Sequence, residues 1–215
     1  MERKPSTYTL EELIGPLNNV EKKYAPKQLY VVGQLAIPLT SPRVSVIGSR
    51  KASSKGLNAA GIVASFFAKH EITVVSGLAE GIDSAAHKGA IEANGRTIAV
   101  LGTPLDKFYP AKNRQLQEYI MQKHLAISQF PIGYPIMPKN FVIRNRTMAL
   151  ISDASIIMEA GNGSGSLHQG WEALRLGRPL FIWSPLMSDQ TLNWTEKLAS
   201  YGAVKFTDPE EVLDE

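Results

Sequence analysis

The sequence predicts a doubly wound α/β domain with a mostly parallel sheet, and three observations support this fold class. Short runs of β-branched and apolar residues alternate along the chain with longer segments of helical periodicity. The apolar runs are continuous, which is typical of parallel strands covered on both faces. The chain has 215 residues, 44% of them hydrophobic, which is enough for one sizeable core. These features indicate a Rossmann-like sandwich with a short N-terminal extension.

Seven segments are predicted strands, and helical patterns occupy most of the intervals between them. The strands cover residues 44–48, 72–76, 97–101, 125–129, 154–158, 179–183 and 203–206. The helices lie near 55–69, 82–94, 112–123, 141–151 and 166–176. In the first helix, Ile62, Val63 and Phe66 recur at helical spacing and would cover one face of the sheet. In the second, a stripe of small residues that includes Ala86 and Gly89 predicts a backbone packed close to the sheet.

The composition divides the chain into three parts. Residues 1–40 form an N-terminal extension, residues 41–207 the α/β domain, and residues 208–215 an acidic tail. Within the extension, Thr9 followed by Glu12 predicts a short helix that begins with a capping box.

Composition also excludes several classes of protein. No run approaches the ~18 uninterrupted apolar residues of a membrane helix, and the N-terminus lacks a signal-peptide core, so no membrane partner is expected. The chain has no cysteine, which excludes disulfides and thiolate metal sites and favours a reducing, cytoplasmic setting. The four histidines, at positions 70, 87, 124 and 168, are scattered, so no metal site is predicted.

The formal net charge of +3 hides an uneven distribution of charge. No acidic residue lies between Glu21 and Glu71 or between Glu118 and Asp153, whereas the last eight residues contain five acids. Basic segments are therefore balanced by an acidic tail.

The loop after the first predicted strand of the domain has the features of an anion site. Gly48 allows close backbone approach, Ser49 and Ser53 offer hydroxyls, and Arg50 would lie at the mouth of the loop. The following helix presents unpaired amides and the positive end of its dipole. The loop lacks the G-x-G-x-x-G spacing, and no acid follows about 20 residues later to hold a ribose. A phosphate therefore fits better than a dinucleotide, and no cofactor is predicted; an exposed arginine on an ordinary turn is the alternative.

Two further loops carry polar residues. Asp83 and His87 lie four residues apart on one helical face, so they could form an acid-base pair. We favour a structural role in which they fix the loop, because no nucleophile or third orienting group accompanies them. The loop that contains Asp106 and Asn113 could line the same cleft, or either residue could cap the next helix.

The segment before and within the fourth helix combines basic residues with an aromatic ring. Lys139, Phe141, Arg144, Asn145 and Arg146 follow a stiff stretch with three prolines between residues 131 and 138. An exposed ring among cations is typical of single-stranded nucleic-acid sites, where bases stack and phosphates pair with guanidinium groups. Phe141 as a core anchor beside solvated arginines is the alternative.

A second anion site is predicted after the fifth strand of the domain. Gly163, Ser164, Gly165 and Ser166 stand at the start of a helix, on the same edge of the sheet as Arg50. Two anion sites on one edge could hold successive phosphates.

These motifs, taken together, resemble the DNA-processing protein A (DprA, also called Smf) family. The resemblance runs in order through VIGSRKAS, VVSGLAEGIDSAAHKGAI, GRTIAVLGTPLDKFYPAKNRQL, FVIRNRTMALIS, IIMEAGNGSGSL and GRPLFIW. It implies an extended Rossmann domain that binds single-stranded DNA without catalytic turnover, forms a homodimer, and helps to load RecA recombinase during natural transformation. It also implies that Arg50, Lys139, Arg144 and Arg146 contact phosphates and that Phe141 lies against a base.

The sequence departs from the family pattern at several positions. Val142 follows Phe141 where the family has proline, His168-Gln169-Gly170 replaces Thr-Ala-Arg, and Ser184-Pro185 replaces Pro-Gly. A nucleoside-monophosphate phosphoribohydrolase of the same superfamily is the alternative function, although its glutamate would be displaced here to Glu172. A third possible function is that of a scaffold for protein partners. The family's dimer interface corresponds to residues 170–205, whose tryptophans could instead fill the core.

Overall fold

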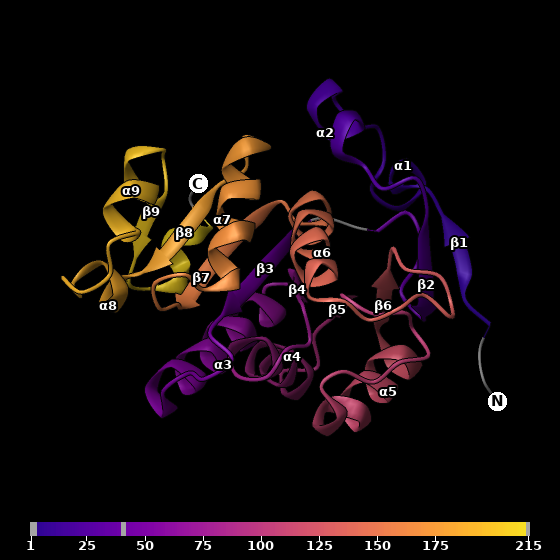
Figure 1. The fold of residues 1–215 in the computed structure, drawn as a ribbon. Coiled ribbons are helices and arrows are strands. Elements are labelled where there is room, and N and C mark those ends of the chain that lie inside the picture. Colours follow the sequence, from indigo (N-terminus) through magenta and orange to yellow (C-terminus); the bar gives the residue numbers. More distant parts are fainter. Residues whose placement is uncertain (1–3, 40–41, 214–215) are drawn as a thin grey trace.

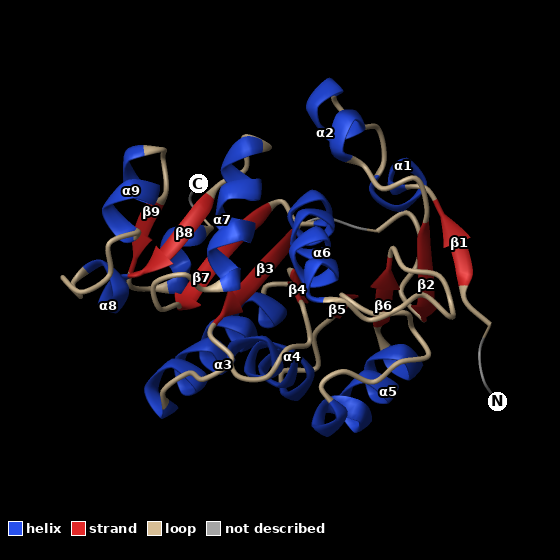
Figure 2. Ribbon diagram, in the orientation of Figure 1, coloured by secondary structure: helices blue, strands red, loops and turns tan. Residues whose placement is uncertain are grey.

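The structure, a computed structural model, describes residues 4–39 and 42–213 and shows one mostly parallel sheet between two layers of helices (Figures 1 and 2). The sheet has nine strands in the order β1-β2-β6-β5-β4-β3-β7-β8-β9. The strands are β1 (Ser6–Tyr8), β2 (Leu29–Gly33), β3 (Arg43–Gly48), β4 (Thr73–Ser76), β5 (Thr97–Leu101), β6 (Leu125–Ser128), β7 (Ala154–Glu159), β8 (Leu180–Trp183) and β9 (Val204–Phe206). Pairing is parallel from β6 through to β9, whereas β2 pairs antiparallel with both β6 and β1. The predicted fold class is confirmed.

The helices divide between the two faces of the sheet. Side chains of α1 (Leu10–Ile14), α6 (Pro138–Ile151), α7 (Gly165–Arg175), α8 (Ser184–Met187) and α9 (Thr195–Ser200) share one core cluster. On the opposite face, α3 (Ser54–Lys69), α4 (Ile82–Glu92) and α5 (Arg114–Lys123) cover the sheet. The short helix α2 (Asn19–Tyr24) and the 3₁₀ turns η1 (Ala111–Asn113) and η2 (Pro209–Val212) complete the described elements.

The order of the strands defines where a ligand is expected. From β3 the chain proceeds outward through β4 and β5 to β6, and it then returns to place β7 on the other side of β3. The connections therefore change direction between β3 and β7. In open α/β sheets the crevice at such a switch point, beyond the carboxyl ends of the strands, is the usual ligand site.

The N-terminal segment differs from the expected separate extension. Its described part, residues 4–39, supplies β1 and β2 to the same sheet, and Leu10 and Leu13 are buried in the main core. The antiparallel addition of β2 to β6 accounts for this, because that strand continues the sheet at its edge. The remainder of the predicted extension, residues 1–3 and 40, lies outside the described residues, as do residues 214–215 of the acidic tail.

Local signals at the N-terminus act as predicted. The Thr9 hydroxyl accepts a hydrogen bond from the Glu12 amide at 3.2 Å, and the Glu12 carboxylate accepts one from the Thr9 amide at 2.6 Å, which forms the capping box of α1. An equivalent box between Asn18 and Glu21 begins α2. The small residues of α4 serve close helix packing rather than contact with the sheet alone, since a side chain at Gly89 would collide with the backbone of Gly61 in α3.

Among the residues that the structure describes, no helix combines the length and the apolar character needed to cross a bilayer.

Candidate functional site

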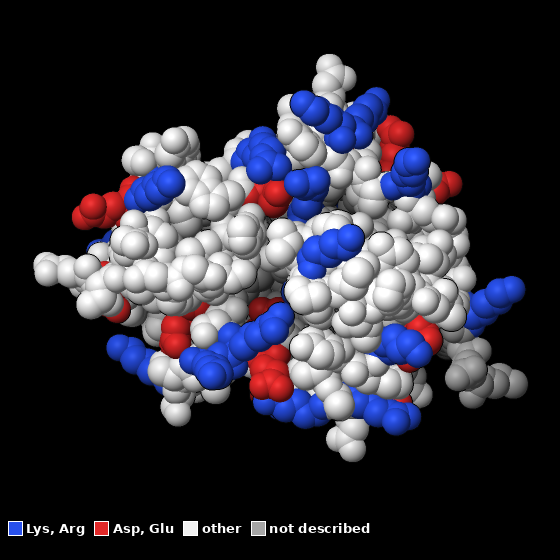
Figure 3. All heavy atoms as spheres, in the orientation of Figure 1, with Lys and Arg blue, Asp and Glu red and all other residues white. Residues whose placement is uncertain are grey.

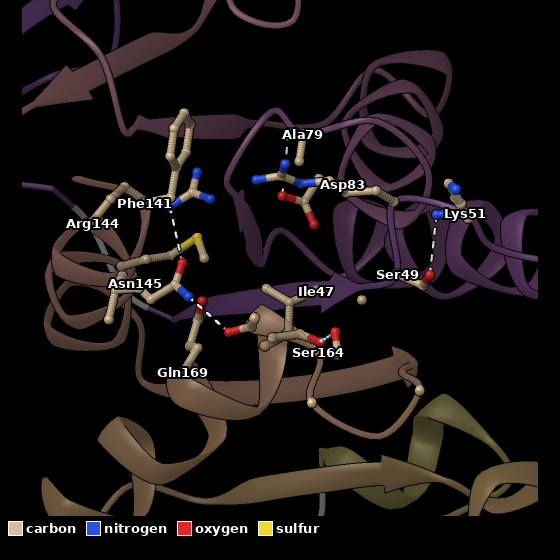
Figure 4. Close-up of a pocket in the computed structure, with 18 of the residues that line it drawn as sticks. Ile47, Ser49, Lys51, Ala79, Asp83, Phe141, Arg144, Asn145, Ser164 and Gln169 are labelled. Atoms are coloured by element: carbon tan, nitrogen blue, oxygen red, sulfur yellow. Dashed lines mark hydrogen bonds between the residues drawn. The ribbon is translucent and has the colours of Figure 1, made fainter. Parts of the chain in front are cut away.

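A cleft of about 440 Å³ opens at the switch point between β3 and β7 (Figure 4). Its walls come from the loop after β3, the first half of α6, and the loop that leads from β7 into α7. The cleft thus brings together most of the residues that the sequence analysis selected. They are Gly48, Ser49, Arg50, Asp83, Phe141, Arg144, Asn145, Gly163, Ser164, Gly165 and Ser166.

Arg50 and Phe141 form the mouth of this cleft. The Arg50 side chain is exposed, and its guanidinium carbon lies 5.4 Å from the centre of the Phe141 ring. Behind the ring, Tyr109 lies 5.2 Å away between centroids, and Gly102 provides space because a Cβ there would lie 2.6 Å from the ring. Phe141 is therefore half-buried, neither a closed core anchor nor a fully exposed platform. It separates the cleft from an adjoining pocket of about 250 Å³ that Tyr109 and Gly102 line.

Arg144 has a different environment from the exposed phosphate contact that the sequence suggested. Its side chain is only 5% exposed, and its Nη1 donates to the carbonyls of Gly77 and Val100, the latter at 2.8 Å. Glycine is required at position 77 because the guanidinium occupies the space of a side chain. Burial lowers the pKa of Arg144, and the nearby Arg50 lowers it further, whereas Asp83 raises it. Arg144 thus joins α6 to the ends of β4 and β5, because buried guanidinium groups must satisfy their donors internally.

Asp83 and His87 have different partners, although they lie on one face of α4. The Asp83 carboxylate accepts a hydrogen bond from the Ala79 amide at 3.3 Å, in the loop after β4. Burial raises the pKa of Asp83, against the opposing effect of the Arg144 charge. His87 is fully buried, outside the cleft lining, and its Nδ1 lies 2.7 Å from Thr97 Oγ1. This geometry supports the structural interpretation over the acid-base pair.

Glu159 is a site residue that the sequence analysis missed. Its carboxylate accepts hydrogen bonds from the Ser53 amide at 2.8 Å and the Ser53 hydroxyl at 2.7 Å, and its backbone carbonyl accepts one from the Ser49 amide at 2.6 Å. Gly56 leaves room for the carboxylate at the N-terminus of α3. The anion at this helix end is therefore an internal carboxylate, and Ser53 supports the loop instead of lining the cleft. The sequence signal that could have identified Glu159 is an acidic residue at the end of a buried strand.

The N-terminus of α7 is open to the cleft. Ser164 precedes the helix and makes no capping hydrogen bond through its side chain, and the hydroxyls of Ser164 and Ser166 lie 2.7 Å apart. No atoms lie within 4 Å of the position that a Cβ would take at Gly163 or Gly165. Asn145 fixes the loop by donating to the Gly165 carbonyl at 3.0 Å (Figure 4). Unpaired amides and free space make this helix end suitable for an anion.

Two predicted phosphate contacts lie outside the cleft. Lys139 is exposed in the first turn of α6. Arg146 does not line the cleft, and its guanidinium contacts Glu172 and the ring of Tyr24 instead. Helical geometry explains this, because five residues along a helix bring the chain to a different face from that of Phe141. Gln169 was also missed: it is buried at the cleft, its Nε2 donates to Ser45 Oγ at 2.8 Å, and its Oε1 has no partner.

No group of three or more His, Asp or Glu side chains arranged for a metal ion occurs within the described ranges 4–39 and 42–213.

Comparison with known sequences points to one family. Residues 8–215 match the sequence model of the family described as DNA recombination-mediator protein A. The DNA processing protein DprA of Streptococcus pneumoniae is 38% identical over 191 residues, which cover 89% of this chain and 67% of that protein. Protein Smf of Escherichia coli is 35% identical over 190 residues, covering 88% of this chain but only 50% of that protein. The chain thus spans between half and two thirds of these relatives.

Solved structures agree with the sequence comparison. The X-ray structure of DprA from Streptococcus pneumoniae superposes with a TM-score of 0.83 at 32% identity, over 99% of this chain and 75% of that one. DprA from Helicobacter pylori, whose structure was reported for its single-stranded DNA binding mode, gives a TM-score of 0.78 at 27% identity, over 97% and 94% of the two chains. The molybdenum cofactor carrier protein of Chlamydomonas reinhardtii, at 20% identity and a TM-score of 0.56, shares the fold alone. The chain belongs to the DNA recombination-mediator protein A (DprA/Smf) family.

Proposed function

We propose that this protein binds single-stranded DNA across the cleft between β3 and β7 and acts without catalytic turnover in DNA processing and recombination. The observation that carries the proposal is the pairing of an exposed guanidinium with a half-buried ring at the mouth of the cleft, Arg50 over Phe141 at 5.4 Å. The relative from Helicobacter pylori, with a reported single-stranded DNA binding mode, supports it.

The cleft offers separate contacts for the backbone and the bases of a strand. Arg50 on one wall and the open N-terminus of α7 on the other favour phosphates, since both present positive charge or unpaired donors. The Phe141 ring would lie against a base, and such stacking tolerates any sequence because every base has a π-face. A polymer that crosses the ends of the strands would use both contacts at once.

The surroundings of the carboxylates argue against hydrolysis. Asp83 is buried and bound to the Ala79 amide, and Glu159 is bound to Ser53. Glu172, which the phosphoribohydrolase alternative would require, pairs with Arg146 and Arg175 and does not line the cleft. Release of free base from nucleoside monophosphates would contradict the non-enzymatic assignment.

Family membership extends the proposal to the wider role of the protein. We include RecA loading during natural transformation, a cytoplasmic setting and homodimer formation. For the homodimer, Trp194 and Leu186 are buried in the chain's own core, whereas Tyr201 is 65% exposed and Val204 lies on the outer strand β9. Tyr201 and Val204 are therefore the large apolar side chains of segment 170–205 that are exposed and available to a second copy.

Titration of a fluorescent oligonucleotide of about 20 nucleotides, followed by anisotropy, tests DNA binding. We expect Phe141→Ala to weaken binding by about 1–3 kcal/mol, the usual contribution of one stacked base. Arg50→Ala should lower affinity and reduce the slope of log K against log salt by about 0.7, because one fewer counterion is released.

Arg114 and Phe108 supply a matched control pair on α5 and the loop before it. The Arg114 guanidinium carbon lies 4.7 Å from the Phe108 ring, and neither residue lines the cleft. Arg114→Ala and Phe108→Ala should leave affinity unchanged. The proposal fails if the protein binds no oligonucleotide at low salt, or if the two pairs of substitutions have equal effects.

A further inference from the structure

A second basic surface lies where α2, α6 and α7 meet, outside the cleft. Three cations surround the ring of Tyr24: Lys23 Nζ at 5.6 Å, Arg146 Cζ at 5.2 Å and Arg175 Cζ at 5.3 Å from its centre. Lys22 is exposed in the same last turn of α2. We call this set the α2 surface; it comprises Lys22, Lys23, Tyr24, Arg146 and Arg175.

The positive charge of the α2 surface is only partly compensated. Arg146 and Arg175 share one acid, Glu172, at 3.3 and 2.9 Å. The Glu172 side chain is 12% exposed, whereas those of the two arginines are 41% and 42% exposed, so the acid lies beneath the cations. Glu21 of α2 is buried and bound to Arg178, so its charge is already paired. The solvent-facing charge at this point is therefore positive.

Attachment of α2 to the domain does not require these cations. Arg178 binds Glu21 and also donates to the carbonyls of Ala149 and Ser152, at the end of α6. The preceding helix is anchored by Leu10 and Leu13 in the core. The cations that converge on the Tyr24 ring repel each other, which costs free energy. A polyanion bound at this surface would attract all of them and offset that repulsion.

The α2 surface is continuous with the cleft along α6. Val142 lines the cleft and is 47% exposed, and Arg146 follows it one helical turn later on the same face. Figure 3 shows Lys and Arg side chains over α2 and over the upper parts of α6 and α7, above the hollow at the centre of the view. A strand that leaves the cleft beside Phe141 would meet Arg146 next.

We propose that the α2 surface is a second contact site for single-stranded DNA, which binds further phosphates of the strand that occupies the cleft. The inference rests on the proposed function. It assigns Arg146 to this outer site, where its guanidinium faces Tyr24. It predicts that long strands gain affinity from contacts that short strands cannot reach.

The test compares oligonucleotides of about 6 and about 30 nucleotides, within and beyond the roughly 4–16 nucleotides that one OB-fold site contacts in other single-strand-binding proteins. The variant Lys22→Gln/Lys23→Gln/Arg175→Gln should bind the long strand at least about tenfold more weakly at 0.1 M salt, with a salt slope smaller by about 2. Its affinity for the short strand should equal that of the wild type. The control Lys69→Gln/Lys88→Gln/Lys123→Gln removes the same charge from exposed positions on α3, α4 and α5 and should bind both strands normally.

The outcomes separate this inference from the proposed function. If the α2 variant binds the long strand as the wild type does, while Arg50→Ala weakens binding of both strands, the second site is wrong and the cleft stands. Equal weakening of both strands by the α2 variant also overturns the inference, because it indicates an effect through the fold. Absence of wild-type binding to either strand contradicts the proposed function itself.

Discussion

At the scale of single residues, His87 shows how burial determines a charge state. Thr97 donates its hydroxyl proton to the Val74 carbonyl at 2.8 Å, so its oxygen accepts from His87 Nδ1 at 2.7 Å. The proton of the neutral ring is therefore on Nδ1, and Nε2 is buried without a partner. A protonated ring would bury an unpaired N–H and a charge. Burial accordingly lowers the pKa of His87 to about 3.

This pKa predicts a loss of stability in acid. Because the folded-state pKa lies below the ordinary value of 6.5, the unfolded chain binds the proton first. The contribution of His87 is fully present above pH 6.5 and declines as the pH falls toward 3, by about 1.4 kcal/mol per pH unit. Urea unfolding at pH 7 and pH 5 should show a decrease of about 2 kcal/mol that is absent in His87→Gln. The exposed His70, changed to Gln, is the control; an equal decrease in all three proteins would contradict this prediction.

Residue types were predictable from the sequence, but their exposure was not. Arg50 and Arg144 both follow motifs that suggest surface cations, yet one is exposed and the other is 5% exposed. The difference arises from Gly77, in a distant loop, which leaves space for the Arg144 guanidinium. Such a cavity depends on how three strands and a helix assemble, and no local pattern records it.

At the scale of elements, Glu159 of β7 holds both ends of the loop that presents Arg50. Its backbone binds the Ser49 amide and its carboxylate binds Ser53, so the loop has fixed geometry on either side of the arginine. Glu159→Ala would leave the Ser53 amide without this partner. An amide donor costs about 1–3 kcal/mol when it has no partner, and the loop would lower that cost by becoming disordered.

Two substitutions of Glu159 separate its role in positioning the Arg50 loop from the effect of its negative charge on DNA binding. Glu159→Ala and Glu159→Gln remove the same negative charge, but the glutamine can still accept from the Ser53 amide and donate to the hydroxyl. We expect Glu159→Ala to bind a 20-nucleotide strand about tenfold more weakly, a loss of about 1.4 kcal/mol, and Glu159→Gln to retain near wild-type affinity. Tighter binding by both variants would show instead that the carboxylate excludes phosphate from the end of α3.

The elements that were predictable are those with a continuous apolar run or a clear helical period. The strands at 44–48 and 97–101 were located within one residue, and the helix near 55–69 was found for the same reason. The elements β1, α8 and α9 were not predicted, because STY, SPLM and TEKLAS contain no continuous β-branched run and too few positions to show a helical period. The second capping box, at Asn18, was visible in the sequence and is the same signal that located α1 at Thr9.

At the scale of the whole molecule, the N-terminal segment and the C-terminal helices share one core. Leu13 of α1 and Leu198 of α9 are both fully buried in the same cluster, which spans the sheet from β2 to β8. If this cluster unfolds as a single cooperative unit, truncating a buried side chain at either end of it lowers the free energy of unfolding of the whole domain. Leu13→Ala and Leu198→Ala should each cost about 2–5 kcal/mol, through lost burial and the resulting cavity.

The tryptophans make this prediction testable, because Trp171, Trp183 and Trp194 all lie in the C-terminal third of the chain. Urea unfolding followed by tryptophan fluorescence therefore reports on β8 and its neighbouring helices, far along the chain from α1. A Leu13→Ala shift of the fluorescence midpoint that matches the shift in circular dichroism would show that residues 4–39 fold together with the sheet. An unchanged fluorescence midpoint, with a separate transition by circular dichroism, would instead identify the N-terminal segment as an independent unit, since only uncoupled parts unfold at different denaturant concentrations.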